Sequence, residues 1–590
     1  MIEIRIHGRG GQGNVVAAYL LAIAAFEQGR YGQAFPSFGA ERRGAPVTAF
    51  VRISEKSIRR RNQVLNPAFL IVQDHALLHT AGVLDGLAPH GGILVNSTLS
   101  SAELSAQMGR EVIAIPASAL AREVLGRPVP NTALLAAFLA LTGIVPVDAL
   151  SRALSKRFKG AVLEKNLELV QKAAELVPAG TWQSQHQVLN QSAPADLSAL
   201  EPLEGSQALA QAVALCRPGV VAAYPITPQT HIVENISKLV ADGKFKTEFV
   251  SVESEFSAAS VALGAAMAGS RTYTASSSQG ILLMAEVLFN IAGLRVPVVM
   301  TCANRAVSAP LSIWNDQQDS LSVRDAGWIQ LYCEDNQEAI DTTIQAYRIA
   351  ERTELPVMVC VDGFTLTHTL EGVTLPTQKT VDEFLPPYQF SRSLDPHHPI
   401  SMGTLMPPEY YTEVRHAHHR AMHGAAQEII AADTDWGYLT SRTYQGLVHA
   451  QGPAEAKIGV LAMGSILGTL REGLEAFPTE SAVRLIKLRC FRPFPVEKLA
   501  ETCAGLTDLI VLERAISPGG AGGIVGLEVA TALSRMSDPP RLHTFVVGLG
   551  GRDIPLDILN RSLEAMETSD NIEPFRILDV NPEKLATEDR

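Results

Sequence analysis

The chain begins with an alternation of apolar and polar residues. Ile2, Ile4 and Ile6 alternate with charged or polar neighbours, and this pattern predicts a β-strand. Glycines are frequent in residues 8–13, and the apolar stretch that runs from there to Phe26 is typical of a helix. The sequence therefore opens with a predicted βα unit.

Short apolar segments recur along the rest of the chain, with helical patterns between them. We predict strands of a first series at residues 49–53, 69–72, 92–95 and 112–115, of a second at 220–224, 248–252, 272–275, 296–302 and 356–361, and of a third at 458–463, 482–488, 508–512 and 543–547. Strands that alternate with helices are typical of α/β domains with mostly parallel sheets. The predicted fold class is α/β, with three such domains.

Changes in composition suggest the domain boundaries. The periodicity fades in residues 181–205, where Pro, Gln, Ser and Asn are frequent, so we predict a linker there, after a first domain of residues 1–180. The second domain spans residues 206–408, of which residues 366–408 are interpreted as an excursion over the surface. Residues 409–590 form a helix and the third α/β domain.

Composition and charge exclude several classes of protein. With 46% hydrophobic and 19% charged residues, the 590-residue chain is that of a packed globular protein. The net charge of -12 provides no basic surface for nucleic acid or an anionic membrane. The longest apolar runs, residues 15–26 and 132–147, fall short of the ~18 to 20 residues of a membrane span. We expect no signal peptide and a cytoplasmic location.

The cysteines argue against a metal centre held by this chain alone. There are six, and none lies in a CxxC pair or at the short spacings that hold iron–sulfur clusters or structural zinc. Their small number also fits a reducing compartment. His416, His419 and His423 share one helical face and are a weaker metal candidate, because no carboxylate or thiolate accompanies them. We predict no metal ligands in the chain.

The first glycine-rich turn is a candidate phosphate site. Gly8, Gly10 and Gly13 form a GxGxxG pattern between a strand and a helix, where backbone N–H groups bind phosphate. A nicotinamide dehydrogenase would place an acidic residue at the end of the next strand, but residues 33–46 read QAFPSFGAERRGAP. Arg42 and Arg43 in that segment favour an anion. The alternative is a tight packing turn without a ligand.

Three positions of the second domain carry candidate chemistry. Pro225, Ile226 and Thr227 follow a predicted strand, at the end where α/β sheets bind ligands. Glu255 opens a helix rich in alanine and glycine, and Arg305 follows another strand. Each has a structural alternative. Thr227 is also a suitable helix cap, Glu255 a favourable charge in a first helical turn, and Arg305 a partner for Asp316 or Asp319.

Together these segments resemble the 2-oxoacid:ferredoxin oxidoreductases, and within them the pyruvate:ferredoxin oxidoreductases. GRGGQG and AFPSFGAERRGAPV look like the family's γ subunit, whereas YPITPQT, VESEFSAASVALGAAMAG, SSSQGILLM, LSIWNDQQD and DGFTLTHT look like its α subunit. The runs FRPFP, RAISPG and GLGGRD of the last domain belong to the same resemblance. The chain is therefore similar to a γ–α fusion with a transketolase-like C-terminal domain. Gln317 and Asn304 depart from the family pattern.

The resemblance implies an activity and a set of partners. It implies that pyruvate, coenzyme A and oxidised ferredoxin are converted reversibly to acetyl-CoA, CO2 and reduced ferredoxin. Thiamine diphosphate would lie between this chain and a β subunit, which supplies Mg2+ and [4Fe-4S] clusters, because no GDG…N segment occurs here. An α2β2-type assembly, ferredoxin and a ferredoxin-like δ subunit or domain are also implied.

The resemblance also assigns roles to single residues. Glu255 would activate thiamine diphosphate beside Pro225, and Arg305 and Thr227 would bind the substrate carboxylate with Ile226 shaping the pocket. Coenzyme A would lie on Gly10, Gly11 and Gly13 with Arg42 and Arg43, or around Ser517 and Gly519 of the last domain. The substrate alternatives are phenylglyoxylate, oxalate and 2-oxoglutarate. A nicotinamide-linked dehydrogenase and a non-catalytic subunit that docks electron carriers are the competing functions.

Overall fold

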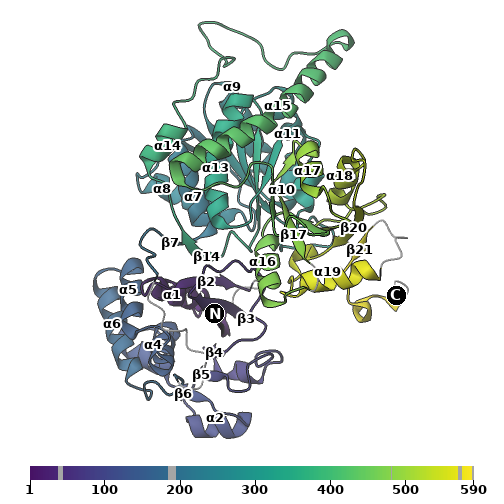
Figure 1. Ribbon diagram of the computed structural model, residues 1–590. Coiled ribbons are helices and arrows are strands. Elements are labelled where there is room, and N and C mark those ends of the chain that lie inside the picture. The colour runs from purple at the N-terminus through teal and green to yellow at the C-terminus, as the bar shows by residue number, and fades with distance from the viewer. Residues whose placement is uncertain (38–43, 184–194, 480–481, 569–574, 588–590) are drawn as a thin grey trace. The chain divides into compact units, whose positions relative to one another are not determined.

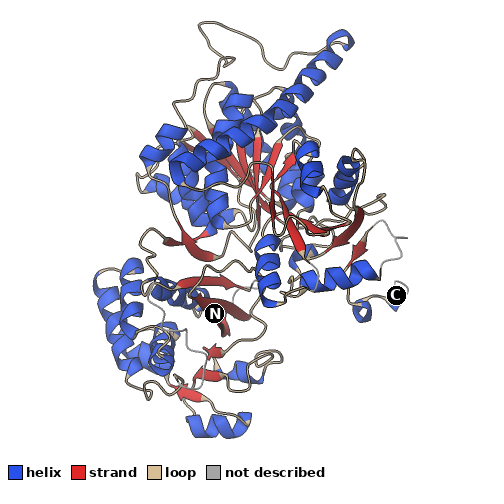
Figure 2. Ribbon diagram, viewed as in Figure 1, coloured by secondary structure: helices blue, strands red, loops and turns tan. Residues whose placement is uncertain are grey.

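The computed structural model describes residues 1–37, 44–183, 195–479, 482–568 and 575–587 (Figure 1). The strands of this part of the chain form sheets of eight, seven and six strands, and Figure 2 shows helices packed along them. The chain divides into two compact units, of which the first contains residues 1–58, 63–205 and 368–374 and the second contains residues 59–62, 206–367 and 375–590. The α/β fold class is confirmed, and each predicted series of strands lies in a separate sheet.

The sheet of the first unit is half parallel and half antiparallel. Its order is β6-β5-β4-β1-β3-β2-β14-β7, and β6, β5, β4 and β1 are parallel while the strands beyond β1 pair antiparallel. The strands are β1 (Ile2–Arg9), β2 (Tyr31–Pro36), β3 (Pro46–Ser54), β4 (Phe69–Val72), β5 (Gly92–Asn96), β6 (Ile113–Ile115), β7 (Glu201–Glu204) and β14 (Leu370–Val373). The expectation of a mostly parallel sheet is wrong here, because β3, β2, β14 and β7 continue the sheet beyond β1 through antiparallel pairings.

Strand β1 is buried on both faces, although its alternation predicts one polar face. Arg5 is buried because its guanidinium donates to the carbonyl oxygens of Val83 and Asp85 at 3.0 and 2.6 Å. His7 is buried beside it, with Nδ1 3.3 Å from the hydroxyl of Thr48. The Nη2 atom of Arg5 is thus satisfied by loop carbonyls rather than by water.

The helices of the first unit enclose its apolar core. They are α1 (Asn14–Phe26), α2 (Ser101–Met108), α3 (Ala117–Leu125), α4 (Asn131–Thr142), α5 (Val147–Arg157) and α6 (Gly160–Ala174). Nearly every residue of α4 is buried, so this helix forms the centre of the core. Residues 184–194 of the predicted linker lie outside the described residues, but Trp182 is buried against Phe69, with ring centroids 5.8 Å apart, and β7 belongs to the sheet.

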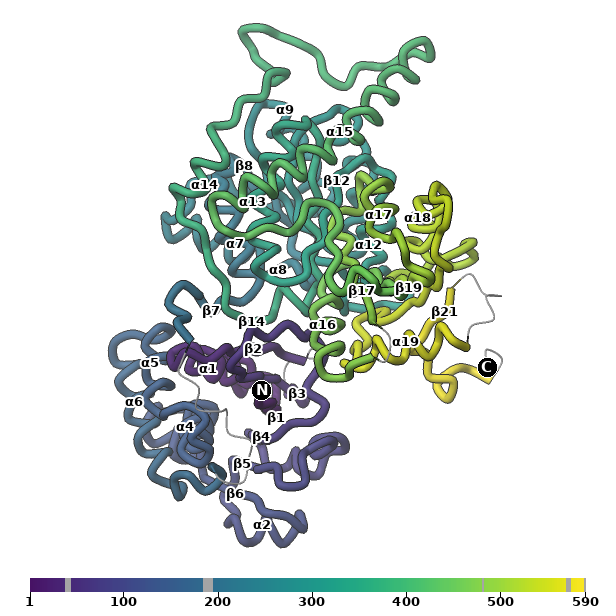
Figure 3. Tube along the Cα trace, viewed as in Figure 1, coloured from purple at the N-terminus to yellow at the C-terminus, as the bar shows by residue number. Residues whose placement is uncertain are grey.

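Part of the predicted surface excursion belongs to this sheet. Leu370 of β14 pairs with Ala34 of β2, and β14 also pairs with β7, so residues 370–373 lie between two strands of the first unit (Figure 3). The chain accordingly passes from one unit to the other at residues 58/59, 62/63, 205/206, 367/368 and 374/375. Residues 181–205 are not the only connection between the units.

The sheet of the second unit that carries the candidate site is almost entirely parallel. Its order is β18-β12-β13-β11-β10-β8-β9, and only the edge strand β18 runs antiparallel. The strands are β8 (Val220–Ala223), β9 (Glu248–Ser251), β10 (Thr272–Ser276), β11 (Val299–Asn304), β12 (Ile329–Tyr332), β13 (Val357–Asp362) and β18 (Cys490–Arg492). Every residue of β10, β11 and β13 is buried, as in parallel sheets covered on both faces.

The last sheet belongs to the same unit and has the order β15-β17-β16-β19-β20-β21. Its strands are β15 (Val448–Gln451), β16 (Ile458–Ala462), β17 (Val483–Leu488), β19 (Asp508–Glu513), β20 (Arg541–Val546) and β21 (Arg576–Ile577). The helices of the second unit are α7 (Gly205–Cys216), α8 (Thr230–Ala241), α9 (Glu255–Met267), α10 (Ser278–Leu283), α11 (Ala285–Gly293), α12 (Gln318–Ser322), α13 (Asn336–Thr353), α14 (Gln378–Phe384), α15 (Pro408–Thr440), α16 (Ile466–Ala476), α17 (Val496–Cys503), α18 (Ile524–Leu533) and α19 (Ile558–Glu567).

Helix α15 is longer than predicted. It has 33 residues, and its second half packs on α13 while its first half is mostly exposed.

Within the described ranges, no helix combines the length and the apolar character that crossing a bilayer requires.

Candidate functional site

Parallel strands bring the predicted site residues of the second unit to one edge of the sheet. Strands β9, β8, β10 and β11 are neighbours in this order and all run the same way. The segments that follow them therefore leave the sheet at a common edge. These segments contain Pro225 to Thr227, Glu255, the glycine of SSSQG and Arg305.

Glu255 is a buried carboxylate without a partner in the described chain. It is the first residue of α9, whose N-cap Ser254 accepts a bond from the N–H of Ser257 at 3.2 Å. Its exposed fraction is 7%, and it forms no hydrogen bond or ion pair with another described residue. Glu253, by contrast, is exposed and accepts a bond from the Ser257 hydroxyl at 2.5 Å. A favourable interaction with the helix dipole requires no burial, so the dipole alone does not account for the buried position of Glu255.

Gly280 shapes the space around Glu255. A Cβ atom at Gly280 would lie 2.8 Å from Cγ and 2.9 Å from Oε1 of Glu255, and 2.3 Å from Oγ of Ser276. Only a glycine allows this approach of α10 to α9. The sequence reasoning did not assign Gly280 to the site, although the SSSQG run that contains it was part of the resemblance.

Arg305 and Thr227 are brought together. The guanidinium of Arg305 donates from Nη1 to the carbonyl oxygen of Thr227 at 2.9 Å, and from Nε to that of Ser312 at 2.8 Å. Burial lowers the pKa of Arg305, and the charge of Asp319 raises it. Asp319 accepts from the backbone N–H of Arg305 rather than from its side chain. Nη2 has no acceptor among the described residues and is available to a carboxylate.

The other residues of this edge are accessible. Pro225 is exposed, and Ile226 and Thr227 are half-buried. The side-chain oxygen of Gln229 accepts from the N–H of Ile226 at 3.2 Å, which fixes the turn between β8 and α8. A ligand on Glu255 and Arg305 would therefore have this turn beside it.

The glycines of the first unit differ in what surrounds them. The N–H of Gly10 donates to the carbonyl oxygen of Ala45 at 2.9 Å. Gly13, with φ 81°, caps α1 close to Asn131, whereas no described atom lies within 4 Å of a Cβ at Gly11. Gly11 is thus the glycine with open space beside the helix N-terminus. Arg42 and Arg43 lie outside the described residues.

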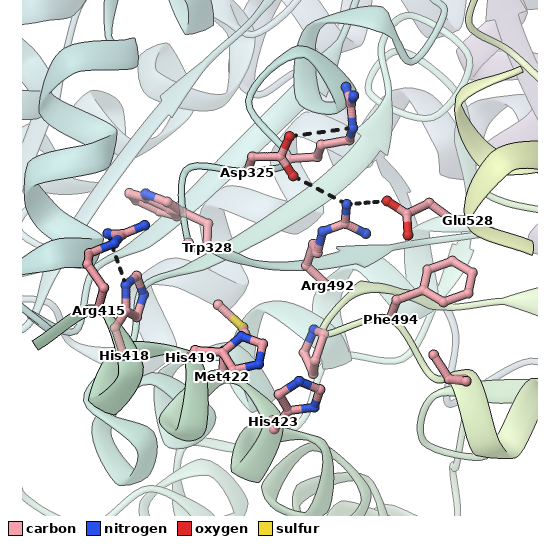
Figure 4. A pocket seen from close by; sticks show the side chains of 14 residues that line it. Asp325, Trp328, Arg415, His418, His419, Met422, His423, Arg492, Phe494 and Glu528 are labelled. Carbon is pink, nitrogen blue, oxygen red and sulfur yellow. Dashed lines mark hydrogen bonds and ion pairs between the residues drawn. The ribbon is translucent and has the colours of Figure 1, made fainter. Parts of the chain in front are cut away.

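A cavity of about 330 Å³ lies elsewhere in the second unit, between α15 and the FRPFP run (Figure 4). Its charged groups are mostly paired, because Arg492 contacts both Asp325 and Glu528, at 3.5 and 2.5 Å. The rings of His419 and His423 lie edge to face with centroids 4.5 Å apart. Within the described part of the chain these two and His416 do not form a three-ligand group. None of the predicted site residues lines this cavity.

Comparison with known proteins places the chain in a family. Models of the family match three parts of the chain: "Pyruvate ferredoxin/flavodoxin oxidoreductase" at residues 3–176, "Pyruvate flavodoxin/ferredoxin oxidoreductase, thiamine diP-bdg" at 211–433, and "Pyruvate:ferredoxin oxidoreductase core domain II" at 456–558. The pyruvate synthase subunit PorA of Methanosarcina barkeri is 44% identical over 375 residues, which are 63% of this chain and 93% of that subunit.

Two further relatives bear on specificity and fold. The ketoisovalerate oxidoreductase subunit VorA of Pyrococcus abyssi is 40% identical over 62% of this chain and 93% of its own length. A solved 2-oxoglutarate:ferredoxin oxidoreductase from Magnetococcus marinus, with 2-oxoglutarate, coenzyme A and succinyl-CoA bound, covers 95% of this chain and 99% of that chain with a TM-score of 0.73 and 20% identity. That likeness shows the fold.

The family models and the relatives define an oxidoreductase with a domain of the thiamine diphosphate-binding type. The chain belongs to the pyruvate ferredoxin/flavodoxin oxidoreductase family, in which it joins the domain matched at residues 3–176 to the thiamine diphosphate-binding domain and core domain II.

Proposed function

We propose that this chain is the γ–α part of a pyruvate:ferredoxin oxidoreductase. The reaction converts pyruvate, coenzyme A and two oxidised ferredoxins to acetyl-CoA, CO2, a proton and two reduced ferredoxins, and it is reversible. The name of the PorA relatives supports pyruvate as the substrate. The observation that carries the proposal is the buried, unpartnered Glu255 at the carboxyl edge of a parallel sheet.

The residues at this edge fit the aminopyrimidine half of thiamine diphosphate. Glu255 offers a carboxylate with no competing partner among the described residues, and Gly280 keeps the space beside it free of a side chain. When bound, the cofactor supplies a carbon nucleophile for the substrate carbonyl and accepts the electrons that decarboxylation leaves. Glu255 holds a proton at the pyrimidine ring nitrogen and so sets the protonation state of the neighbouring amino group. Pro225 lies in the turn that would border the ring.

Arg305 and Thr227 orient the 2-oxoacid. Arg305 keeps one free N–H pair while its other groups hold Thr227 and Ser312 in place. A guanidinium in so dry a position binds a carboxylate through charge-assisted hydrogen bonds. Ile226, in the same turn, contributes apolar surface next to a short substrate chain.

Coenzyme A is assigned to the first unit. Gly10, Gly11 and Gly13 precede α1, and the open side of Gly11 leaves room for a phosphate there. Arg42 and Arg43 are the cations proposed to pair with the phosphates.

Changing both Arg42 and Arg43 to Ala should raise the Michaelis constant for coenzyme A while single-turnover decarboxylation without coenzyme A stays intact. Unchanged dependence on coenzyme A would move the site, for example to Ser517 and Gly519.

A β subunit completes the enzyme. The six cysteines are all buried and free, so the [4Fe-4S] clusters are assigned to partner chains, and free thiols fit a cytoplasmic enzyme. The Mg2+ site is assigned to the β subunit because the chain has no GDG…N segment. Four apolar side chains on α9, α10 and α11, the helix that Glu255 begins and the two that follow it in the chain, are exposed: Phe256, Leu282, Leu283 and Phe289. We assign these side chains to the contact with the β subunit. The proposal extends to what the resemblance implies: an α2β2-type assembly with ferredoxin as acceptor and a ferredoxin-like δ subunit or domain.

Co-expression tests this division of roles. The purified chain should be colourless and inactive, and the complex with its β subunit should show iron–sulfur absorbance and pyruvate-dependent reduction of ferredoxin or viologen. An active, brown chain without the partner would contradict the proposal.

The same assay with 2-oxoisovalerate, 2-oxoglutarate, phenylglyoxylate and oxalate tests the substrate, because the VorA relatives are nearly as similar to this chain as the PorA relatives are. Reduction of a nicotinamide without ferredoxin would favour the dehydrogenase alternative.

A further inference from the structure

Asp319 connects the two strand ends on either side of the candidate site. It lies in α12 and is fully buried, with an exposed fraction of 0%. Its Oδ2 accepts from the backbone N–H groups of Ser278 and Arg305, each at 2.9 Å. Its Oδ1 accepts from Nδ2 of Asn304 and from the N–H of Ser320, each at 2.8 Å. One carboxylate thus receives four donors from the segments after β10 and β11 and from its own helix.

The four N–H donors stabilise the buried Asp319 carboxylate in the absence of an ion-pair partner among the described residues. Asp319 forms no ion pair with any described residue, although a buried carboxylate is costly unless its oxygens are satisfied. Burial raises the pKa of Asp319 to about 6, and the bonds from Ser278, Asn304 and Arg305 act in the opposite direction. Both oxygens act only as acceptors, each from two N–H donors, as the oxygens of an ionised carboxylate do.

The backbone that Asp319 holds is unfavourable on its own. Ser278 has φ 49°, in the left-handed region that residues other than glycine rarely adopt. Ser278 begins the turn that brings Gly280 against Glu255. Arg305, held by the same Oδ2 atom, directs its guanidinium to the carbonyl of Thr227. Both halves of the site therefore depend on one carboxylate.

We propose that Asp319 is the positioning residue that fixes the distance between the Glu255 side and the Arg305 side of the site. It contacts neither cofactor nor substrate, and it acts through Ser278 and Arg305. The inference rests on the proposed site, but the ordering of the two segments is measurable without any ligand.

Asp316 provides a matched control three residues earlier, just before α12. It is also fully buried, but it accepts from the N–H of Gln318 at 3.0 Å and from that of Gly550 at 3.1 Å. Asp316→Asn should therefore disturb the contact with residues 549–551 and leave Ser278 and Arg305 in place. Comparison of Asp319→Asn with Asp316→Asn distinguishes an effect on the position of the site residues from the general effect of losing a buried carboxylate.

Hydrogen–deuterium exchange of the purified chain is the direct test. The amide nitrogen of Asp319→Asn cannot accept a hydrogen bond. With that nitrogen in the place of Oδ2, the N–H groups of Ser278 and Arg305 each lose one bond, so exchange should be about tenfold faster in residues 277–281 and in residues 304–307. Asp316→Asn should show no change in these two segments. In the complex with the β subunit, Asp319→Asn should raise the Michaelis constant for the 2-oxoacid by a similar factor.

The outcomes separate this inference from the proposed function. Faster exchange in both segments together with normal turnover of Glu255→Gln would support the positioning role and refute the catalytic one. Unchanged exchange in either segment would overturn the positioning role. If Asp319→Asn does not fold, Asn304→Ala removes one of the four donors, and it should raise exchange in both segments by a smaller factor. No change in Asn304→Ala would then overturn the proposal.

Discussion

Gly280 lies so close to Glu255 that a Cβ atom added at Gly280 would be 2.8 Å from Cγ of Glu255, closer than the carbon atoms of two side chains pack. Gly280→Ala should therefore displace Glu255 or Ser276 and lower kcat by about tenfold or more, since misplacing a catalytic group is costly. The control is Gly264→Ala, where a Cβ meets no atom within 4 Å. Equal activity of both variants in the viologen assay would show that Glu255 is not needed in this position.

Glu255→Gln should keep the fold and lose catalysis. The substitution retains the size of the side chain but removes the carboxylate that holds a proton at the pyrimidine ring, and general acid–base groups contribute roughly 10²- to 10⁴-fold. Glu253→Gln, two residues earlier and exposed, should leave kcat unchanged. Thiamine diphosphate binding, followed by calorimetry in the complex, distinguishes loss of chemistry from loss of the cofactor. Full turnover of Glu255→Gln with cofactor bound would refute its role.

Arg305→Lys should weaken use of the 2-oxoacid. A lysine keeps the charge but cannot contact Thr227, Ser312 and a carboxylate together, so kcat/KM should fall by about 10- to 100-fold, the equivalent of a charged hydrogen bond. Arg324→Lys, at the rim of the other cavity, serves as the control. Unchanged kcat/KM accompanied by loss of assembly with the β subunit would show that Arg305 is structural.

Leu283→Glu should prevent association with the β subunit. Leu283 has an exposed fraction of 52% and lies on α10 with the exposed Leu282, and a charge buried there by a partner would be unpaired. The melting temperature of the isolated chain should not change. Val162→Glu, on α6 of the first unit and 55% exposed, is the control and should assemble normally. Size-exclusion chromatography of the mixed subunits measures the difference, and a normal complex of Leu283→Glu would place the β subunit elsewhere.

His7 should make the first unit sensitive to acid. Burial, and then the charge of Arg5, lower the pKa of His7 from its ordinary value of 6.5 to about 4. Because the folded pKa is depressed, neutral His7 contributes stability above pH 6.5 that is lost as the pH falls towards 4, with a slope of at most ~1.4 kcal/mol per pH unit. His7→Asn should therefore show a smaller fall in melting temperature between pH 7 and pH 5. Parallel curves for the two proteins would contradict this.

Much of the site was predictable because parallel strands end at one edge. Thr227, Glu255 and Arg305 each follow a strand in the sequence, and the structure places those strands side by side. The bond between Arg305 and Thr227 was not predictable, because a backbone carbonyl as acceptor leaves no trace in residue type. Asp319 was predictable only as a side-chain partner of Arg305, since nothing in the sequence indicates that it binds a backbone N–H.

Strands with an uninterrupted apolar run were predicted most closely, whereas β12 (Ile329–Tyr332), which is fully buried but contains a glutamine, was missed. β4 was predicted with its observed bounds, Phe69–Val72. β2, β7 and β14 were missed, because Tyr31–Pro36 contains a glycine and a proline, and the other two are four-residue strands with polar residues. Strands of this kind are defined by their neighbours in the sheet rather than by an apolar pattern of their own.

The position of β14 has a consequence for how this protein can be divided. A fragment that ends at residue 205 would retain β2 and β7 but lack Leu370–Val373, the strand that pairs with both. The backbone edge of β2 would then be open to any extended peptide, including the same edge of another copy. A well-behaved fragment of the first unit therefore requires residues 370–373 to be supplied, as a grafted strand or as a separate peptide. Any homologue that carries the two parts on separate polypeptides must either close this edge by other means or exchange a strand between subunits.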